Sequence, residues 1–277
     1  MSAMNLLTPI TLDLSGPRGD VRVRYAFDLE SEVQRGMHTH LTEGRFYEEA
    51  TSQLFASVLK PGDTFIDIGA HVGYFSMLAA ALVGPEGEVV SFEPSPGNYR
   101  QLLEHIALNG FTNVLPFHLA LGDREQVMPL HLNADNDGGH ALWDVGLHEA
   151  NEKSRATPII YPAYVTRLDR VLQGRPIRSL KAIKLDIEGS EVLALRGSVE
   201  SIARHQVPFI VAEVNRTGLE LMGTSENELR ALMTGLGYET WIIQEGSGEV
   251  QPLADDMMVV GNFVFNLLFR RPGAVIG

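Results

Sequence analysis

The amino-acid sequence predicts an α/β fold, built as a doubly wound and mostly parallel β-sheet. The first observation is that short apolar runs alternate, over most of the chain, with segments whose apolar residues recur at helical spacing. The second is that Thr64–Ile68 and Glu88–Phe92 have the composition of strands buried on both faces of a sheet. The third is the turn from Gly69 to Gly73, whose small residues directly follow the first of these runs.

An extension over residues 1–60 precedes the main domain. Residues 8–14 and 21–27 alternate apolar and polar side chains around a turn at residues 15–17, which predicts a β-hairpin. Residues 46–59 carry apolar side chains at helical spacing, so we expect a helix that leads into the first core strand. We expect this extension to cover part of a cofactor or substrate site.

The main domain alternates strands and helices after the second strand. Ser95 is expected to cap the next helix, and residues 114–119 to form the third strand. Further along, residues 182–186 form a strand, and Ser190 is expected to cap one helix that continues to about Arg204. Such alternation places helices on both faces of the sheet.

The main domain, residues 61–277, is interrupted by an insertion at residues 126–171. Here the sequence predicts strands at residues 127–132 and 158–168, separated by a polar loop at residues 133–140. Loops on a rigid scaffold commonly bind substrates, so we expect the insertion and the N-terminal extension to form the substrate pocket.

The last third of the chain continues the alternation. Residues 208–214 form a strand, and Ser225 with Glu228 makes a capping box at the start of a helix. Residues 238–243 and 258–268 are the last two strands, joined by a polar turn, so we expect the sheet to end in an antiparallel pair.

The composition excludes several classes of protein. With a formal charge of -13 on 277 residues, binding to nucleic acid or to an anionic membrane is disfavoured by repulsion. The absence of cysteine excludes disulfides, thiolate nucleophiles and zinc–thiolate sites. No signal peptide and no membrane span is visible, so we expect a cytoplasmic protein. Whether it forms a homodimer is left open.

The turn after the first strand and the acid after the second predict a nucleoside-bearing cofactor. Gly69, Ala70 and Gly73 let the backbone approach a ligand, and Glu93 can accept hydrogen bonds from both ribose hydroxyls. His71 stands where a dinucleotide fingerprint has its middle glycine, which disfavours NAD. S-adenosylmethionine (SAM) has a ribose and no phosphate, and Asp67 completes a set of groups suited to it. The alternative is a tight strand-to-helix turn with no ligand.

Several segments of the chain, in order and spacing, resemble the FkbM family of SAM-dependent methyltransferases, which have the Rossmann-like class I methyltransferase fold: GRFYEE (44–49), LKPGDTFIDIGAHVGYFS (59–76), VVSFEPSPGNYRQL (89–102), ALGD (120–123), TRLDRVL (166–172), IKLDIEGSEVLALRG (183–197) and FIVAEV (209–214). The resemblance implies a seven-stranded sheet with one reversed edge strand. It also implies methyl transfer, usually to a hydroxyl oxygen of a secondary metabolite or sugar. The chain departs from the family at His71, where asparagine is more frequent.

The predicted cofactor-binding residues lie in these segments. The resemblance places Glu48 near the amino group of the cofactor, while Asn98 is expected to hold the ribose or the helix start. Asp123 is expected either at the adenine edge or simply in a turn. The full set is Glu48, Asp67, Gly69, Ala70, His71, Gly73, Tyr74, Phe75, Glu93, Pro94, Asn98, Ala120, Asp123 and Asp186.

Methyl transfer to oxygen requires alignment of the acceptor and a base for its proton. We predict Asp186 as this base because it ends a strand at the ligand edge of the sheet, with Glu188 and His140 as further catalytic candidates. The alternative for Asp186 is to cap the following helix or to orient the amine of the cofactor.

A divalent metal such as Mg²⁺ is a second hypothesis for this edge. Asp186, Glu213 and His140, together with Glu188, supply the carboxylate and imidazole ligands that magnesium or manganese accepts. The alternative is a set of unconnected acids on a solvated rim.

The sequence therefore favours an O-methyltransferase that acts on a small hydroxylated molecule. An NAD-dependent oxidoreductase and a nucleoside-binding protein without chemistry remain as alternatives. The acceptor itself cannot be named from these residues.

Overall fold

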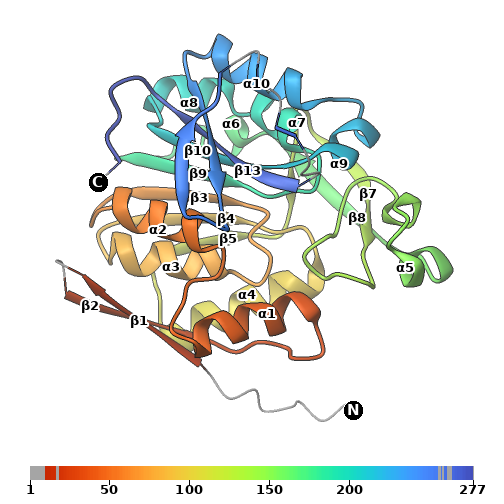
Figure 1. Cartoon of the computed structure of the whole chain (residues 1–277), viewed down its shortest axis with the longest axis horizontal. Helices are drawn as coiled ribbons and strands as arrows, with labels where there is room; N and C mark the ends of the chain where they lie inside the picture. The colour runs from red at the N-terminus through yellow and green to blue at the C-terminus, as the bar shows by residue number, and fades with distance from the viewer. Residues whose placement is uncertain (1–9, 17–18, 255–256, 258, 261–263, 277) are drawn as a thin grey trace.

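The computed structural model describes residues 10–16, 19–254, 257, 259–260 and 264–276, apart from the side chains of residues 14–21. Its centre is an eight-stranded sheet with α-helices on both faces (Figure 1). In spatial order the strands are β12 (Glu249–Pro252), β11 (Glu239–Gln244), β13 (Val264–Arg270), β10 (Phe209–Asn215), β9 (Leu180–Leu185), β3 (Thr64–Ile68), β4 (Glu88–Phe92) and β5 (Val114–Phe117). The doubly wound α/β prediction is confirmed.

The strand directions correct one detail of the expected sheet. β5, β4, β3, β9 and β10 pair in parallel, while β13 is antiparallel to both of its neighbours, β10 and β11. The reversed strand therefore lies inside the sheet and not at its edge. The turn after β11 adds an eighth strand, β12, which is antiparallel to β11 and forms the edge. The predicted antiparallel pair of the last two long strands is confirmed as β11 and β13. The second strand was expected from residue 258; residues 258 and 261–263 lie outside the described part, and residues 259–260 are not in a strand.

The two faces of the sheet bury separate cores because consecutive strand side chains point in opposite directions. On β3, Phe65 packs into one cluster and Ile66 into the other. The Phe65 cluster is covered by α2 (Glu49–Val58) and α3 (Tyr74–Val83), with α4 (Pro96–Asn109) on the same side (Figure 1). Among the described residues, no helix is both long enough and apolar enough to span a membrane.

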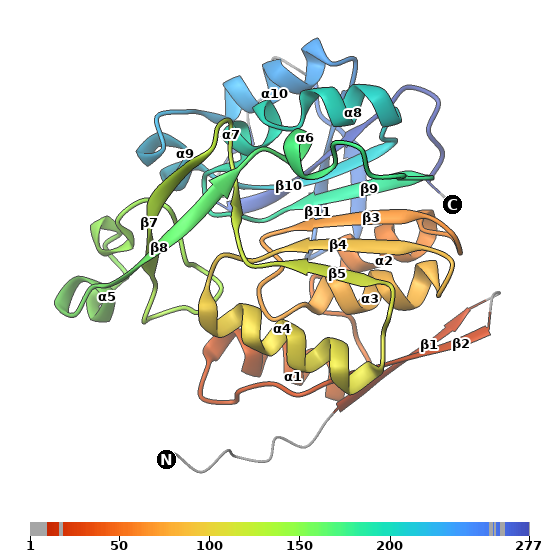
Figure 2. The ribbon, with the colours of Figure 1, turned by 180° about the vertical axis from the view of Figure 1, so that it is seen from behind.

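The opposite face is covered by the helices of the C-terminal half (Figure 2). The expected helix from Ser190 to Arg204 is two helices, α7 (Glu191–Arg196) and α8 (Val199–His205). They separate at Gly197, where a Cβ atom would lie 2.0 Å from the carbonyl oxygen of Gly122. At α10 (Glu226–Gly235) the serine half of the predicted capping box is confirmed, since Ser225 accepts from the N–H of Glu228 (3.2 Å), but the Glu228 carboxylate pairs with Arg196 instead. The helix α9 (Arg216–Leu221) was not predicted.

Two predicted serine caps are wrong. The hydroxyls of Ser95 and Ser190 are buried and make no hydrogen bond to the described residues. Neighbouring glutamates accept hydrogen bonds from other backbone amides beside these helix starts. Glu93 accepts from the backbone N–H of Ser95 (2.7 Å), and Glu191 accepts from that of Gly189 (3.1 Å). A carboxylate close to a helix N-terminus also complements the helix dipole.

The predicted hairpin of the N-terminal extension is confirmed as β1 (Ile10–Gly16) and β2 (Gly19–Tyr25), an antiparallel pair; residues 8 and 9 lie outside the described part. A helix that was not predicted, α1 (Glu32–Thr42), follows it. Tyr25 and Phe27 belong to the same core cluster as Phe65, so the extension packs directly on the main body.

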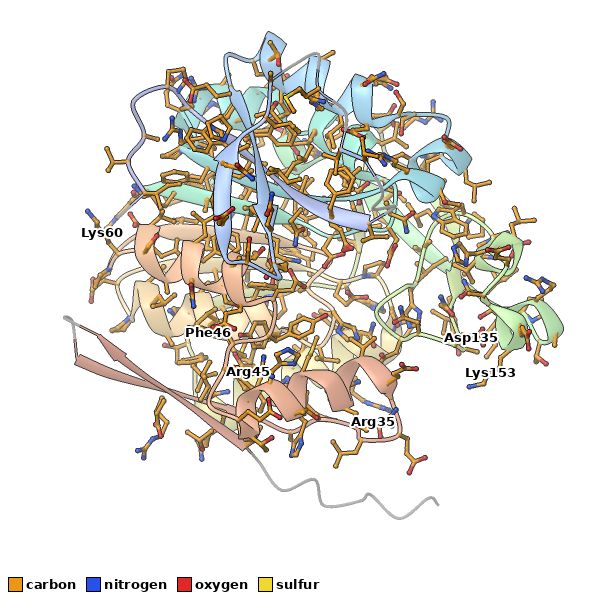
Figure 3. All side chains as sticks on the ribbon, in the orientation of Figure 1. Arg35, Arg45, Phe46, Lys60, Asp135 and Lys153 are labelled. Carbon is orange, nitrogen blue, oxygen red and sulfur yellow. The ribbon has the colours of Figure 1, made fainter. Side chains whose placement is uncertain are left out.

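The two strands of the insertion, β7 (Gln126–Leu132) and β8 (Ile159–Thr166), form a small three-stranded sheet with β6 (Ala120–Leu121), which precedes the insertion; the spatial order is β6, β8, β7. Both predicted strands are present, and the sheet extends from one side of the molecule (Figure 2). Between them lie η1 (Val145–Leu147) and α5 (Glu152–Ala156), and α6 (Leu168–Val171) follows β8. Asp135 accepts hydrogen bonds from the backbone N–H groups of Lys153 and Ser154, which joins the polar loop to α5 (Figure 3).

Candidate active site

A cavity of about 690 Å³ lies at the carboxyl ends of β3, β4, β9 and β10. In a parallel sheet this edge is where ligands bind. The cavity is lined by fifteen of the predicted site residues: Glu48, Asp67, Gly69, Ala70, His71, Tyr74, Phe75, Glu93, Pro94, Asn98, Ala120, His140, Asp186, Glu188 and Glu213.

Two predicted residues lie elsewhere. Asp123 is not part of the cavity lining; its carboxylate is 3.9 Å from the guanidinium of Arg124. Gly73 also lies outside the lining, at the start of α3. A Cβ atom there would lie 2.5 Å from Cδ1 of Leu102, so this glycine permits close packing of α3 against α4. Of the two roles expected for Asp123, its position outside the lining fits a turn residue and not a contact at the adenine edge.

The turn after β3 is fixed by backbone contacts. The N–H groups of Gly69 and Ala70 both donate to the carbonyl oxygen of Phe92 (2.9 Å each). Gly69 has φ +83°, and a Cβ atom would lie 1.8 Å from the carbonyl oxygen of Asp186. Only glycine fits this approach of the turn to the end of β9. The end of β3 is therefore held against both neighbouring strands.

Glu93 lies directly after β4 and is 5% exposed. Its two carboxylate oxygens accept hydrogen bonds from the backbone N–H groups of His71 (2.8 Å) and Ser95 (2.7 Å). Burial raises the pKa of Glu93 to about 7 despite these hydrogen bonds. The amides fix the carboxylate beside the turn, and the lone pairs that remain can accept from a diol.

Asp67 is the second buried acid of this region. Its Oδ2 accepts a hydrogen bond from the hydroxyl of Ser76 (2.6 Å), which in turn lies 2.7 Å from the hydroxyl of Ser91. Burial raises the pKa of Asp67 to about 6. This chain of side chains links β3, α3 and β4 beneath the turn.

Asp137, in the polar loop of the insertion, was not predicted as a site residue. Its carboxylate accepts hydrogen bonds from Ser31 (2.5 Å) and from Gln34 on α1 (2.7 Å), and it lies 3.5 Å from Nε2 of His71. Its carbonyl oxygen accepts from the side chain of Asn98 (3.0 Å). Burial alone would raise the pKa of Asp137, but the interactions with His71, Ser31 and Gln34 lower it. Asp137 therefore joins the insertion, α1 and the turn at one point.

Lys184, on β9, was also missed, since a lysine within an apolar strand has no spacing signal of its own. Its side chain is 2% exposed. The ammonium lies 2.7 Å from the carboxylate of Asp186, 4.0 Å from that of Glu48 and 4.5 Å from the ring centre of Phe75. Burial disfavours the charged lysine, but the charges of Asp186, Glu48 and Asp67 outweigh this and raise its pKa. A buried lysine of this kind is stable only with such partners.

The salt bridge with Lys184 makes Asp186 a poor candidate for the predicted general base. Burial alone would raise the pKa of Asp186, but the lysine charge, followed by hydrogen bonds with Glu213 and Lys184, lowers it. A carboxylate in a salt bridge with a lowered pKa is a weak proton acceptor at neutral pH. The position of Asp186 therefore suits orientation of a ligand, the alternative considered above, better than general-base catalysis.

Glu188 has the properties that the base requires. Burial and the charge of Asp186 raise the pKa of Glu188 to about 7. Its Oε2 accepts a hydrogen bond from the side-chain amide of Asn215 (2.6 Å). A carboxyl group whose pKa lies near the working pH can take up and release a proton efficiently.

His140 lines the cavity but is not placed to act as a base. Its Nδ1 accepts a hydrogen bond from the backbone N–H of Asn133 (2.9 Å), so the proton of the neutral ring lies on Nε2. Burial lowers the pKa of His140 to about 4. The ring is therefore neutral at physiological pH and can donate a hydrogen bond through Nε2.

The metal hypothesis is not supported. Among the described residues, no three histidine, aspartate or glutamate side chains are grouped so that they could hold a metal ion. Asp186, Glu213 and His140 line one cavity, yet the Lys184 ammonium already compensates the charge of Asp186. Burial raises the pKa of Glu213 well above its usual range, and neighbouring acids add to this. A raised pKa makes this carboxyl group a poorer metal ligand, because a ligand must lose its proton to bind.

The charges of the wall fit SAM better than a dinucleotide. Seven carboxyl groups belong to the described lining: Glu48, Asp67, Glu93, Asp186, Glu188, Glu213 and Glu245. The described lining includes no arginine, and its one lysine, Lys184, is already paired with Asp186. A pyrophosphate needs donors or cations, whereas a sulfonium and an ammonium group favour carboxylates. Glu93 lies beside the turn after β3, and Glu48 and Asp186 both lie within 4.0 Å of the Lys184 ammonium.

The family model described as "Methyltransferase FkbM domain" matches residues 67–240. The curated 31-O-demethyl-FK506 methyltransferase FkbM of Streptomyces tacrolimicus is 29% identical over 205 residues, which cover 65% of this chain and 74% of that protein. The AMB antimetabolite synthetase AmbE of Pseudomonas aeruginosa is 23% identical over 269 residues, which cover 86% of this chain and 12% of the synthetase. A solved structure, methyltransferase FkbM from Methylobacillus flagellatus KT, has 14% sequence identity and a TM-score of 0.46, covering 79% of this chain and 50% of its own.

Proposed function

We propose that this chain, which belongs to the FkbM methyltransferase family and is a SAM-dependent methyltransferase, transfers the methyl group to a hydroxyl oxygen of a small molecule. Family membership shows methyl transfer from SAM, and the hydroxyl acceptor is what we propose in addition. One relative is named a 31-O-demethyl-FK506 methyltransferase, which supports an oxygen acceptor. A secondary metabolite or a sugar-containing molecule is the class of substrate we propose.

The observation that carries the proposal is the position of Glu188, whose carboxyl group lines the cavity and is held by the side-chain amide of Asn215 (2.6 Å). SAM, when bound, supplies a methyl group on a positively charged sulfur. A hydroxyl acceptor must lose its proton during transfer, and Glu188, with a pKa of about 7, is suited to take it. An amine acceptor that is already unprotonated would need no such group at the moment of attack.

The other residues bind and orient. Glu93 accepts from the ribose, and the salt bridge of Asp186 with Lys184 faces the amino-acid end of SAM. The N-terminal extension contributes Val33, Met37 and Tyr47 to the lining, and the insertion contributes Leu130, Ala141 and Leu142. These apolar side chains exclude water and offer contacts for a largely apolar acceptor.

The test is a reaction of the purified chain with SAM and an extract of hydroxylated metabolites. We expect a product that has gained one methyl group on oxygen, formed in equal amount with S-adenosylhomocysteine. Glu188→Gln should lower turnover by about 100-fold or more while SAM affinity stays unchanged. Glu220→Gln, an exposed glutamate on α9, is the matched control and should leave turnover unchanged.

Methylation on nitrogen or carbon would contradict the proposed acceptor class. Full turnover by Glu188→Gln would contradict the proposed base. SAM binding without any transfer, in extracts that contain the acceptor of a related enzyme, would favour a nucleoside-binding protein instead.

A further inference from the structure

Glu188 has a strained backbone. Its φ of +53° lies in the left-handed region, which a residue with a side chain rarely adopts. Such a conformation persists only where the surroundings enforce it. The contacts of Glu188 therefore indicate what holds this side chain at the cavity.

Two hydrogen-bond donors hold Glu188, one at the backbone and one at the carboxyl group. The indole Nε1–H of Trp143 donates to its carbonyl oxygen (2.6 Å). The side-chain amide of Asn215 donates to its Oε2 (2.6 Å). Together they fix both the peptide and the direction of the carboxylate.

The two donors come from separate parts of the molecule. Asn215 ends β10, and its Oδ1 caps α9 by accepting from the N–H of Gly218 (2.9 Å). Trp143 belongs to the insertion, is 8% exposed and packs with Ala141, Val145 and Met222. The insertion is thus joined to Glu188 by a partly buried hydrogen bond, while the sheet holds the carboxylate.

We propose that Asn215 and Trp143 are positioning residues for Glu188, and that Trp143 couples the inserted segment to the proposed base. This inference rests on the proposed function. Asn215 fixes the carboxylate and favours its ionised form, because its amide donates to that form. Trp143 keeps the left-handed peptide in place, so the carboxylate points into the cavity only when the insertion is docked.

Charged groups from several elements face Glu188. Asp186, directly after β9, repels its ionised form, and Glu188 in turn raises the pKa of Glu213 on β10 and of Glu191 on α7. Lys184 on β9 favours the ionised form. Asn215 is the neutral donor in this set, so its removal changes the ionisation of Glu188 without changing the net charge.

The test of Asn215 is a titration of Glu188 in the whole chain by ¹³C NMR of labelled glutamate carboxyl groups. The Glu188 signal is assigned by its loss in Glu188→Gln. Asn215→Ser keeps an oxygen that can cap α9 but is too short to reach Glu188. We expect its titration midpoint to rise by about one pH unit. Asn215→Asp, which also keeps the cap and adds a negative charge, should raise it further.

Asn266→Ala is the matched control, because Asn266 donates to Glu48 instead (3.3 Å). The Glu188 midpoint should stay unchanged in this variant. If Asn215→Ser and Asn215→Asp both leave the midpoint of Glu188 where it is in the wild type, the proposed role of Asn215 is wrong.

The test of Trp143 is amide hydrogen exchange in Trp143→Phe, which keeps an aromatic ring and removes the donor. The N–H of Gly189 donates to Glu191 (3.1 Å) and reports on this peptide turn. We expect its exchange to become about tenfold faster, because the partly buried carbonyl of Glu188 loses its partner. Trp241→Phe removes the other tryptophan, on β11, and should not change this exchange. Equal exchange in Trp143→Phe and the wild type would refute the coupling.

Neither measurement needs the methyl acceptor. A failure of the proposed methyl transfer would leave the titration and exchange results intact. Conversely, an unchanged titration and exchange would refute the positioning of Glu188 even if methylation of oxygen is observed.

Discussion

Lys184 is a buried positive charge that lies among acids from three separate segments of the chain, Glu48, Asp67 and Asp186. It is the partner of Asp186 at 2.7 Å and lies 4.0 Å from Glu48. Removing one member of a buried ion pair leaves the other charge without compensation, which is strongly destabilising. The residue therefore contributes both to folding and to the charge of the cavity.

We expect Lys184→Met to lower the free energy of unfolding by about 3 kcal/mol or more. Urea denaturation monitored by circular dichroism measures this change. Lys181→Met, a lysine on the same strand whose ammonium lies 5.4 Å from the ring centre of Phe209, serves as the control and should change stability far less. Equal stability of both variants would show that the Lys184 pair is not needed for folding.

Glu93 is the residue on which the cofactor site depends most. Glu93→Ala removes the acceptor of the His71 and Ser95 amides and the expected ribose contact. We expect the dissociation constant for SAM, measured by calorimetry, to rise about tenfold or more. Glu104→Ala, an exposed glutamate on α4, is the control. An unchanged affinity in Glu93→Ala would place the ribose elsewhere.

The sequence correctly predicted those cavity residues whose positions are determined by the end of a buried strand. Glu93, Asp67 and Gly69 lie at the cavity because the strands before them are apolar and end at the same edge of the sheet. Lys184 and Asp137 could not be found in this way. The function of each depends on partners distant in sequence, and a single sequence does not show those pairings. Asp186 was found, but its lysine partner determines its chemistry.

At the scale of elements, the polar loop of the insertion is held against α1. Asp137 receives hydrogen bonds from Ser31 and Gln34, and the loop carbonyl receives one from Asn98. These contacts cross from the N-terminal extension to the insertion, above the turn that follows β3. The cover of the cavity is therefore assembled from two segments.

We expect Asp137→Ala to release this contact. Amide hydrogen exchange should become faster in residues 133–140 and in α1, and SAM affinity should fall about fivefold to tenfold. Asp123→Ala, an aspartate outside the cavity lining, should change neither quantity. If exchange in residues 133–140 does not change in Asp137→Ala, the loop is held by other contacts.

The sequence predicted those helices and strands whose apolar residues recur with a clear local period. The buried strands of the main sheet and the hairpin were found, since their apolar periodicity is local. The break between α7 and α8 was missed because it follows from the approach of Gly197 to Gly122, a contact between distant parts of the chain. The helices α1 and α9 were missed as well.

For the whole molecule, the buried acids predict how stability depends on pH. Burial raises the pKa of Glu93 to about 7 and that of Glu191 to about 8, and Glu188 shifts in the same direction. A carboxyl group with a higher pKa in the folded state binds its proton more tightly there, so stability falls as pH rises towards and through the folded pKa. His105 and His140 have lowered pKa values, so they have the opposite effect and raise stability as pH rises. This gain is complete above about pH 6.5, the pKa of an unfolded histidine.

We therefore expect the ligand-free chain to lose about 2 kcal/mol of unfolding free energy between about pH 6.5 and about pH 8.5. Urea denaturation at the two pH values measures this loss. Glu191→Gln should reduce the loss, because one of the titrating acids is removed. A stability that rises over this pH interval would contradict the description of the cavity.

The central claim is that the cavity at the ends of β3 and β4 binds SAM. The most direct measurement is isothermal titration calorimetry of the purified chain with SAM and, separately, with NADH. We predict saturable heat with SAM at one site per chain, and no binding of NADH. Saturable binding of NADH together with no heat from SAM, in protein shown to be folded, would contradict this description of the site.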